Sequence, residues 1–209
     1  MRIFILGTGR NGSKTIAKAC RHSTNYTAAH ESLSRNFGAA RFAYPDNHIE
    51  SDNRLSWELG HLEKHFGDEA CYVHLKRDKE EVARSYQRRI CQPDSIIDAF
   101  CSGIRMSPIE RMDEPMQLEV CRDYVDTVTA NINHFLASKS RVMTIHLASI
   151  EQQFPEFWQW IGAEGDLQKA LAELTKRHNH TTKRRLKVKQ RLKLYLRREY
   201  QHVKLWFNS

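Results

Sequence analysis

The chain has 209 residues, of which 40% are hydrophobic and 28% are charged, a composition that indicates one folded globular domain and excludes a disordered protein. The formal net charge is +8, but ten Lys and Arg residues and a single acid lie in residues 183–209. The remaining 23 bases and 24 acids leave residues 1–182 almost neutral, so the net charge gives no support to nucleic-acid binding.

Strand and helix patterns alternate along most of the chain. We expect strands at 2–7, 26–30, 70–76 and 141–147, and helices at about 13–22, 55–66, 79–90, 94–104, 116–137, 150–161 and 166–177. Strands separated by helices predict an α/β fold, in which a parallel central sheet has helices on both faces. The segment 91–115 contains three prolines and interrupts the alternation, so we predict a lid or an acceptor-binding insertion there.

A glycine-rich loop follows the first predicted strand. Between Gly7 and Thr15 it contains three glycines, an arginine, a lysine and several hydroxyl groups. Such a loop aims backbone N–H groups and a helix N-terminus at one point, so it predicts an anion site, most often for phosphate. The nucleotide-kinase pattern G-x-x-x-x-G-K-[ST] fits Gly7 and Gly12, but Ser13 displaces Lys14 by one position.

Other polar residues are predicted at the same edge of the sheet, beyond the carboxyl ends of the strands. His30 and Glu31 follow the second predicted strand, and the polar segment 50–54 precedes another predicted helix. Arg77 follows the third predicted strand, and Ser85 lies eight residues later on a helix. Because an arginine fork and a hydroxyl both bind phosphate, these two residues predict a second anion pocket.

These residues resemble the sulfotransferases that use 3′-phosphoadenosine 5′-phosphosulfate (PAPS). The first loop of that family reads [RK]-x-G-[ST]-x-[ST], and residues 10–15 (Arg-Asn-Gly-Ser-Lys-Thr) match it without an offset. A second motif of the family, R-[DN]-P with a Ser eight residues after the Arg, is similar to residues 77–79 (Arg-Asp-Lys) and Ser85. In several carbohydrate and tyrosyl members the catalytic base is a Glu after the second strand, and Glu31 lies at a matching place.

The resemblance implies a three-layer, P-loop-like α/β domain that moves a sulfuryl group from PAPS to a hydroxyl-bearing small molecule or saccharide, with carbohydrate favoured. It implies three catalytic residues, which are Glu31 as general base and Arg10 and Lys14 as charge stabilisers. It also implies that PAPS and its product PAP bind Gly9, Arg10, Asn11, Gly12, Ser13, Lys14, Thr15, Arg77 and Ser85. No metal is expected, because a sulfate ester carries less charge than a nucleoside triphosphate.

Alternatives to this hypothesis stay open. A P-loop kinase for nucleotides or small molecules would need Mg²⁺, and the sequence offers no clear acidic ligand after the third strand. A non-catalytic sulfotransferase-like protein would hold a polyanion with its basic C-terminal residues. Glu31 is also suited to a helix cap or a salt bridge, and Asp78 is expected to cap the helix that begins at Lys79.

Cysteines and histidines give weaker indications. Five cysteines without a C-x-x-C pair favour reduced, mostly buried thiols, and with no visible signal peptide they predict a cytoplasmic protein. His61 and His65 lie four residues apart but lack the H-E-x-x-H order, so we expect a solvated helix face.

The C-terminal residues form a separate unit in this interpretation. We divide the chain into a sulfotransferase-like domain at 1–182 and a basic amphipathic helix at 183–209, docked on the same domain. Its bases are alternatively suited to an acidic acceptor, to the 3′-phosphate or to an anionic membrane surface. The segment 178–181 is a candidate replacement for the glycine-rich loop that covers the nucleotide in many family members.

Overall fold

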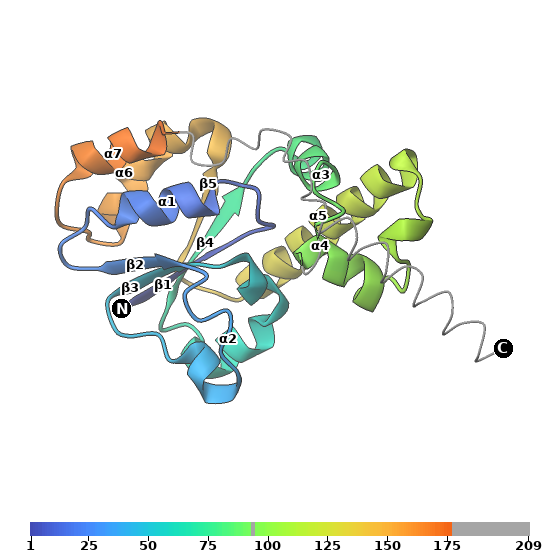
Figure 1. Ribbon diagram of the computed structural model, residues 1–209. Helices are drawn as coiled ribbons and strands as arrows, with labels where there is room; N and C mark the ends of the chain where they lie inside the picture. The colour runs from blue at the N-terminus through green and yellow to red at the C-terminus, as the bar shows by residue number, and fades with distance from the viewer. Residues whose placement is uncertain (93–94, 177–209) are drawn as a thin grey trace.

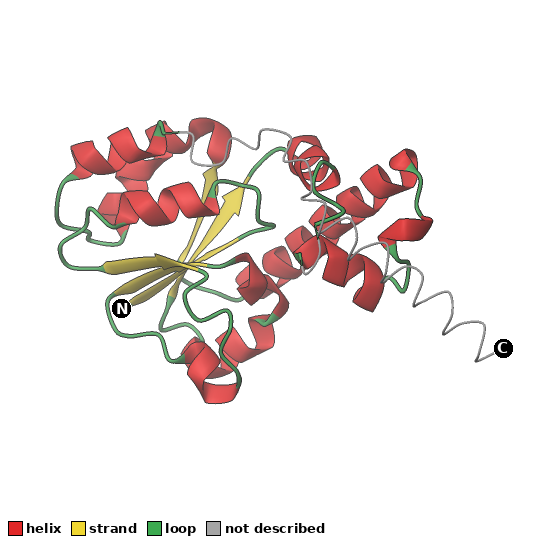
Figure 2. Cartoon of the chain, in the orientation of Figure 1, coloured by secondary structure: helices red, strands yellow, loops and turns green. Residues whose placement is uncertain are grey.

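The computed structural model describes residues 1–92 and 95–176 (Figure 1). Its centre is a parallel five-stranded sheet with the strand order β2-β3-β1-β4-β5. The strands are β1 (Arg2–Leu6), β2 (Thr27–His30), β3 (His48–Ser51), β4 (Cys71–Lys76) and β5 (Val142–His146). Helices cover both faces of the sheet, so the predicted three-layer α/β fold is confirmed (Figure 2).

One face of the sheet is covered by α1 (Ser13–Cys20), α6 (Ile150–Trp160) and α7 (Leu167–Leu174). Side chains alternate between the faces of a strand, and Ile3 and Ile5 of β1 point to this side. The buried residues of α1 that pack against them are Ile16, Ala19 and Cys20, whose i, i+3, i+4 spacing forms one helix face. The N-terminus of α1 is thereby fixed beside the end of β1.

The opposite face is covered by α2 (Leu59–Phe66), α3 (Lys79–Gln87) and α5 (Glu114–Leu136). Phe4 of β1 and Tyr72 of β4 point into this second core. Tyr124 and Val128 of α5 are fully buried in the same cluster. Both cores flank β1, which places the loop after this strand at the centre of the carboxyl edge.

The segment 91–115 is mostly helical where the structure describes it. It contains α4 (Ile96–Ala99), the π-helical turn η3 (Phe100–Ile104) and the 3₁₀ turn η4 (Ile109–Arg111). Ile97 and Phe100 are 1% exposed and join the core formed by α5, whereas Met106 is 85% exposed. One side of this segment is therefore anchored, and its role as a lid or an acceptor-binding insertion stays a prediction.

Strand β3 is absent from the sequence-based prediction. Residues 50–54 are expected there as a polar segment before a helix, but Glu50 and Ser51 complete β3. The strand escapes detection because its buried residues His48 and Glu50 are polar. His48 Nε2 lies 3.1 Å from Glu50 Oε2, and the Ser32 hydroxyl also donates to this carboxylate, so Glu50 is buried with partners.

The other predicted elements are found with small changes at their ends. The expected helix at 55–66 is divided into the 3₁₀ turn η2 (Asn53–Trp57) and α2. Asp78 caps α3 as expected, because its Oδ1 accepts a hydrogen bond of 2.9 Å from the N–H of Glu81.

The five cysteines are free, and all except Cys91 are buried. His61 and His65 stack on the ring of Phe42, at centroid distances of 5.1 and 4.9 Å. Within residues 1–92 and 95–176, no three His, Cys, Asp or Glu side chains are grouped to hold a metal ion. In the same residues, no helix is both long and apolar enough to span a bilayer.

The basic helix expected at 183–209 and the segment 178–181 lie outside the described residues. The division of the chain at residue 182 therefore stays a prediction.

Candidate functional site

The glycine-rich loop joins β1 to α1 through backbone that is largely left-handed. Gly9, Arg10 and Gly12 have φ angles of 74°, 56° and 91°. Only glycine fits at positions 9 and 12, because an added Cβ would lie 2.5 Å from Tyr86 Oη and 2.6 Å from Leu147 Cδ1, respectively. Gly12 precedes the first turn of α1 without a side-chain cap. The N–H of Thr15 donates to the Gly12 carbonyl at 2.9 Å, so the N–H groups of Ser13 and Lys14 are the candidate donors for an anion at this helix start.

Hydrogen bonds from distant elements hold this loop in place. The carbonyl of Thr8 accepts from the hydroxyls of Tyr86 (2.6 Å) and Tyr124 (2.9 Å), which come from α3 and α5. Asn11 is 1% exposed, and its Nδ2 donates to the carbonyl of Leu75 in β4 at 2.7 Å. Asn11 therefore anchors the loop to the sheet, whereas the resemblance implies that it binds the donor.

The second motif lies against the first. Arg10 Nε donates to Ser85 Oγ at 3.1 Å, which joins the loop to α3. Arg77 Nη1 donates to the carbonyl of Arg10 at 2.9 Å, and its Nε donates to Glu81 Oε2 at 2.8 Å. The structure thus brings Arg77 and Ser85 together at Arg10, which lies between them.

A cluster of four arginines surrounds this point, formed by Arg10, Arg77, Arg88 and Arg89. Burial lowers the pKa of Arg10, and the like charges of the other three lower it further. Within the described residues, only Arg77 of this cluster has an acidic partner, Glu81. The cluster therefore carries uncompensated positive charge beside the glycine-rich loop.

Arg88 and Arg89 have no assigned role in the sequence-based site. They follow Ser85 by three and four residues, directly after Gln87, the last residue of α3, and Arg88 is the C-cap of that helix. Their spacing of three and four residues from Ser85 is the sequence signal that could have identified Arg88 and Arg89 as members of the site. The pKa of Arg89 is also lowered, by burial first and then by the charge of Arg88.

Ser13 and His30 connect the loop to the end of β2. The distance between Ser13 Oγ and His30 Nε2 is 3.1 Å, and both side chains are partly buried. Burial lowers the pKa of His30, and Lys14 lowers it too, although three nearby carboxylates act in the opposite direction. Because its pKa is lowered, the imidazole of His30 is neutral near pH 7. In the first turn of α1, Lys14 is exposed and Thr15 is partly buried.

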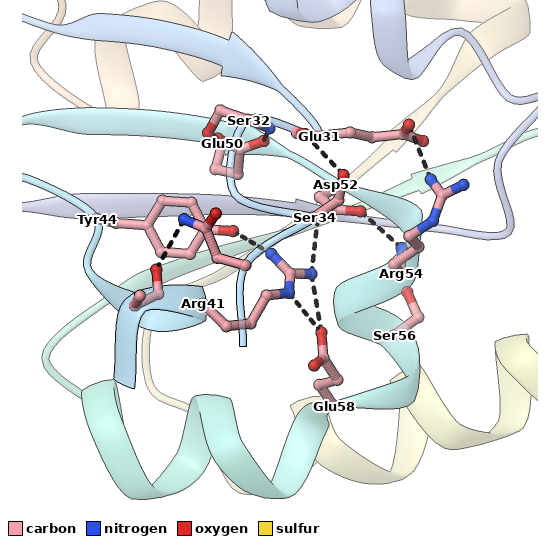
Figure 3. Close-up of polar contacts among 12 residues, drawn as sticks. Glu31, Ser32, Ser34, Arg41, Tyr44, Glu50, Asp52, Arg54, Ser56 and Glu58 are labelled. Atoms are coloured by element: carbon pink, nitrogen blue, oxygen red, sulfur yellow. Dashed lines mark hydrogen bonds and ion pairs between the residues drawn. The ribbon is translucent and has the colours of Figure 1, made fainter. Parts of the chain in front are cut away.

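Glu31 follows β2 in a left-handed backbone conformation, with φ 53°. Its Oε2 lies 2.8 Å from Nη1 of Arg54, and the two side chains are 29% and 38% exposed (Figure 3). The salt bridge expected as an alternative for Glu31 is thus present. Arg54 is its partner, which no local sequence pattern reveals because 23 residues separate the two.

Buried polar contacts hold Arg54 in turn (Figure 3). Asp52 Oδ1 accepts from the backbone N–H of Arg54 at 2.8 Å, and Asp52 Oδ2 lies 2.7 Å from Nη2 of Arg41. Arg41 also donates to Tyr44 Oη at 2.7 Å and to Glu58 at 2.9 Å. Burial raises the pKa of Asp52 despite the opposing charge of Arg41.

Glu31 and Arg10 act on one common group, the hydroxyl of Tyr86. Burial is the largest cause that raises the pKa of Tyr86, the charge of Arg10 lowers it and the charge of Glu31 raises it. Because β1 and β2 both run parallel to β3, the predicted general base lies at the same carboxyl edge of the sheet as the glycine-rich loop. The loops after β1, β2, β3 and β4 meet at this edge, as open parallel sheets favour.

By sequence, the chain matches no protein-family model and no curated protein. Among solved structures, it is similar to the "Sulfotransferase Domain from the Curacin Biosynthetic Pathway", with a TM-score of 0.59. The chain has a sulfotransferase-like fold. The match covers 90% of this chain and 81% of that chain at 12% sequence identity, which shows the fold alone.

The strand order explains why the two motifs that predict anion binding are contiguous. β1 and β4 are neighbours in the sheet, so the loop after Leu6 and the start of α3 after Lys76 lie side by side. β2 is separated from β1 by β3, so Glu31 approaches from the other side. A ligand held by the loop would therefore lie between the arginine cluster and Glu31.

Proposed function

We propose that this protein is a PAPS-dependent sulfotransferase that acts on a hydroxyl acceptor. The arginine cluster around the glycine-rich loop carries this proposal. PAPS has a 5′-phosphosulfate and a 3′-phosphate, so it needs a strongly positive site with two groups of donors. Four arginines with one acidic partner among the described residues supply that charge, and the loop supplies N–H groups.

Binding of the donor would divide between the two motifs. The 5′-phosphosulfate would lie at the start of α1, against the N–H groups that follow Gly12 and the hydroxyls of Ser13 and Thr15. The 3′-phosphate would lie beside Ser85 and Arg77, where Arg89 adds a further guanidinium.

Transfer would proceed in line at the sulfur atom. The acceptor oxygen forms a bond to sulfur while the bond between sulfur and the bridging oxygen of PAPS breaks, and PAP leaves. Glu31 takes the proton of the acceptor hydroxyl, which is worth about 10²–10⁴-fold in rate. Arg10 and Lys14 stabilise the charge that develops on the bridging oxygen and the sulfuryl group. Saccharides are the favoured acceptor class, on the resemblance of the loop and Glu31 to carbohydrate-type members.

Thermal shifts test donor binding. We expect PAP to raise the melting temperature more than ATP or ATP·Mg²⁺ does, because ligand binding to the folded state stabilises it. Arg77→Ala should weaken the PAP effect, whereas the matched control Arg84→Ala should not, because Arg84 is an exposed residue of the same helix with a 3.9 Å contact to Glu80. Stabilisation by ATP·Mg²⁺ without PAP would favour the kinase alternative.

Transfer is tested with PAPS and a panel of hydroxyl-bearing saccharides, by following PAP formation. Glu31→Gln should keep PAP affinity and lower transfer about 10²–10⁴-fold. PAP binding without transfer to any acceptor would favour the non-catalytic alternative.

A further inference from the structure

The contact between Ser13 and His30 joins the anion-binding loop to the strand that carries Glu31. Ser13 is the first residue of α1, and His30 is the last residue of β2. Ser13 Oγ and His30 Nε2 are 3.1 Å apart, and one hydrogen atom must lie between them. The donor in this pair decides what the Ser13 hydroxyl offers to a ligand.

A neutral imidazole has one nitrogen that donates and one that accepts, whereas a serine hydroxyl has a single hydrogen to donate. If Nε2 of His30 is the acceptor, Ser13 donates its single hydrogen to the imidazole, and the lone pairs of its oxygen face a ligand in the loop. Lone pairs repel a phosphate or phosphosulfate oxygen. If Nε2 carries the hydrogen, Ser13 accepts from His30 and its own hydrogen is directed to the anion.

We propose that His30 is a positioning residue for the anion site: it donates Nε2–H to Ser13 Oγ and so turns the Ser13 hydroxyl into a donor for the bound anion. The identity of that anion as a phosphosulfate rests on the proposed function. The direction of the hydrogen bond does not, because any phosphate-bearing ligand at the start of α1 needs the same donor.

The charges around His30 add a pH dependence to this arrangement. Lys14 faces it from α1, Glu31 from the end of its own strand, and Glu50 and Asp52 from β3 and the residue after it. A bound dianion adds negative charge beside the imidazole, so it favours protonation of His30. By reciprocity, protonation favours the anion, and protonated His30 still donates Nε2–H to Ser13. We expect the PAP affinity of wild type to rise as the pH falls, relative to that of a variant without the imidazole.

Imidazole ¹⁵N NMR on the full chain reads the hydrogen bond directly, with and without PAP. We expect Nε2 to carry the hydrogen in the neutral form, and a His30 with its hydrogen on Nδ1 would overturn the proposal. This measurement needs neither turnover nor a variant. If PAP failed to bind, the proposed function would be contradicted, while the free protein would still decide the tautomer.

Variants of His30 test the consequence for binding. The amide nitrogen of His30→Gln reaches the position of Nε2 and can donate to Ser13, whereas that of His30→Asn is too short. We expect His30→Asn to weaken PAP binding about tenfold, the value of one hydrogen bond to a charged group, and His30→Gln to keep affinity within about threefold. As the pH falls below 6.5, the variants should lack the additional affinity that wild type gains from protonation of His30.

A double-variant comparison separates positioning from general damage. In a Ser13→Ala background, His30→Asn should cause no further loss of PAP affinity, because His30 acts through the Ser13 hydroxyl. An undiminished loss in that background would contradict the proposal, as would wild-type affinity in His30→Asn. Melting temperatures of all variants show that the comparison uses folded protein.

Discussion

Backbone strain is found at two residues of the candidate site. Arg10 and Glu31 have φ angles of 56° and 53°, where a residue with a Cβ costs about 1–3 kcal/mol. Each is held by a contact from a distant segment, Arg10 by Ser85 and Glu31 by Arg54. Holding these two side chains at the carboxyl edge of the sheet therefore lowers the stability of the fold.

Two substitutions of Arg10 separate its backbone role from its charge. Arg10→Gly removes the guanidinium and relieves the strain, whereas Arg10→Ala removes the guanidinium only. We expect Arg10→Gly to be more stable than Arg10→Ala by about 1 kcal/mol, as measured by urea unfolding. Both should bind PAP about tenfold more weakly than wild type, because both lack the charged donor. Equal stability of the two variants would contradict strain at this position.

At the scale of elements, β3 determines how the residues that support Glu31 are held in the site. Its end continues into η2, so Asp52 and Arg54 are fixed by strand pairing and by the buried side chain of Arg41. Asp52 is fully buried and Arg41 is 4% exposed. A buried carboxylate without its cation is costly, which makes this ion pair a structural support for the Arg54–Glu31 pair.

Arg41→Met should therefore destabilise the protein strongly. It leaves Asp52 buried without a charge partner, a loss of about 3–5 kcal/mol in the free energy of unfolding. The control is Arg54→Gln, which breaks an ion pair between partly exposed residues and should cost less than about 1 kcal/mol. Urea unfolding measures the free energy of unfolding of both variants. Similar losses would show that burial does not make the Arg41–Asp52 pair more important for stability than the Arg54–Glu31 pair.

At the scale of the whole molecule, the parallel sheet collects residues from four loops at one edge and sets the response of the fold to acid. His74 lies in β4 near the middle of the sheet and is 2% exposed. Burial lowers its pKa from 6.5 to about 4, and the charges of Lys76 and His146 lower it as well, against a hydrogen bond with Asn133. Its neutral form is therefore part of the folded state.

This shift predicts acid sensitivity between pH 6.5 and about pH 4. In this window the unfolded chain binds a proton at His74 and the folded chain does not, so lowering the pH favours unfolding. We expect His74→Gln to remove a slope of up to about 1.4 kcal/mol per pH unit from the free energy of unfolding. Because His30 is present in both proteins, the difference isolates His74. If the free energy of unfolding changed with pH in the same way for wild type and His74→Gln, the lowered pKa of His74 would be contradicted.

The sequence by itself determines the elements whose information is local. The apolar run of β1, the glycines after it and the periodicity of α1 are contiguous, so the loop can be predicted from neighbouring residues, and the candidate anion site rests on the same residues. The spacing of Arg77 and Ser85 is likewise readable. β3 cannot be read this way, because the polar residues of a buried strand are satisfied by partners elsewhere in the chain.

Only the tertiary structure decides the partners of the charged groups. Glu31 forms an ion pair with Arg54, and Arg10 donates a hydrogen bond to Ser85. Ser13 likewise lies within hydrogen-bond distance of His30, because the strand order places these loops together. The structure also shows that the charges of Arg88 and Arg89 act on Arg10, and within residues 1–92 and 95–176 neither arginine has an acidic partner. Charge neutralisation depends on distances between segments far apart in sequence, and the sequence pattern contains no such distances.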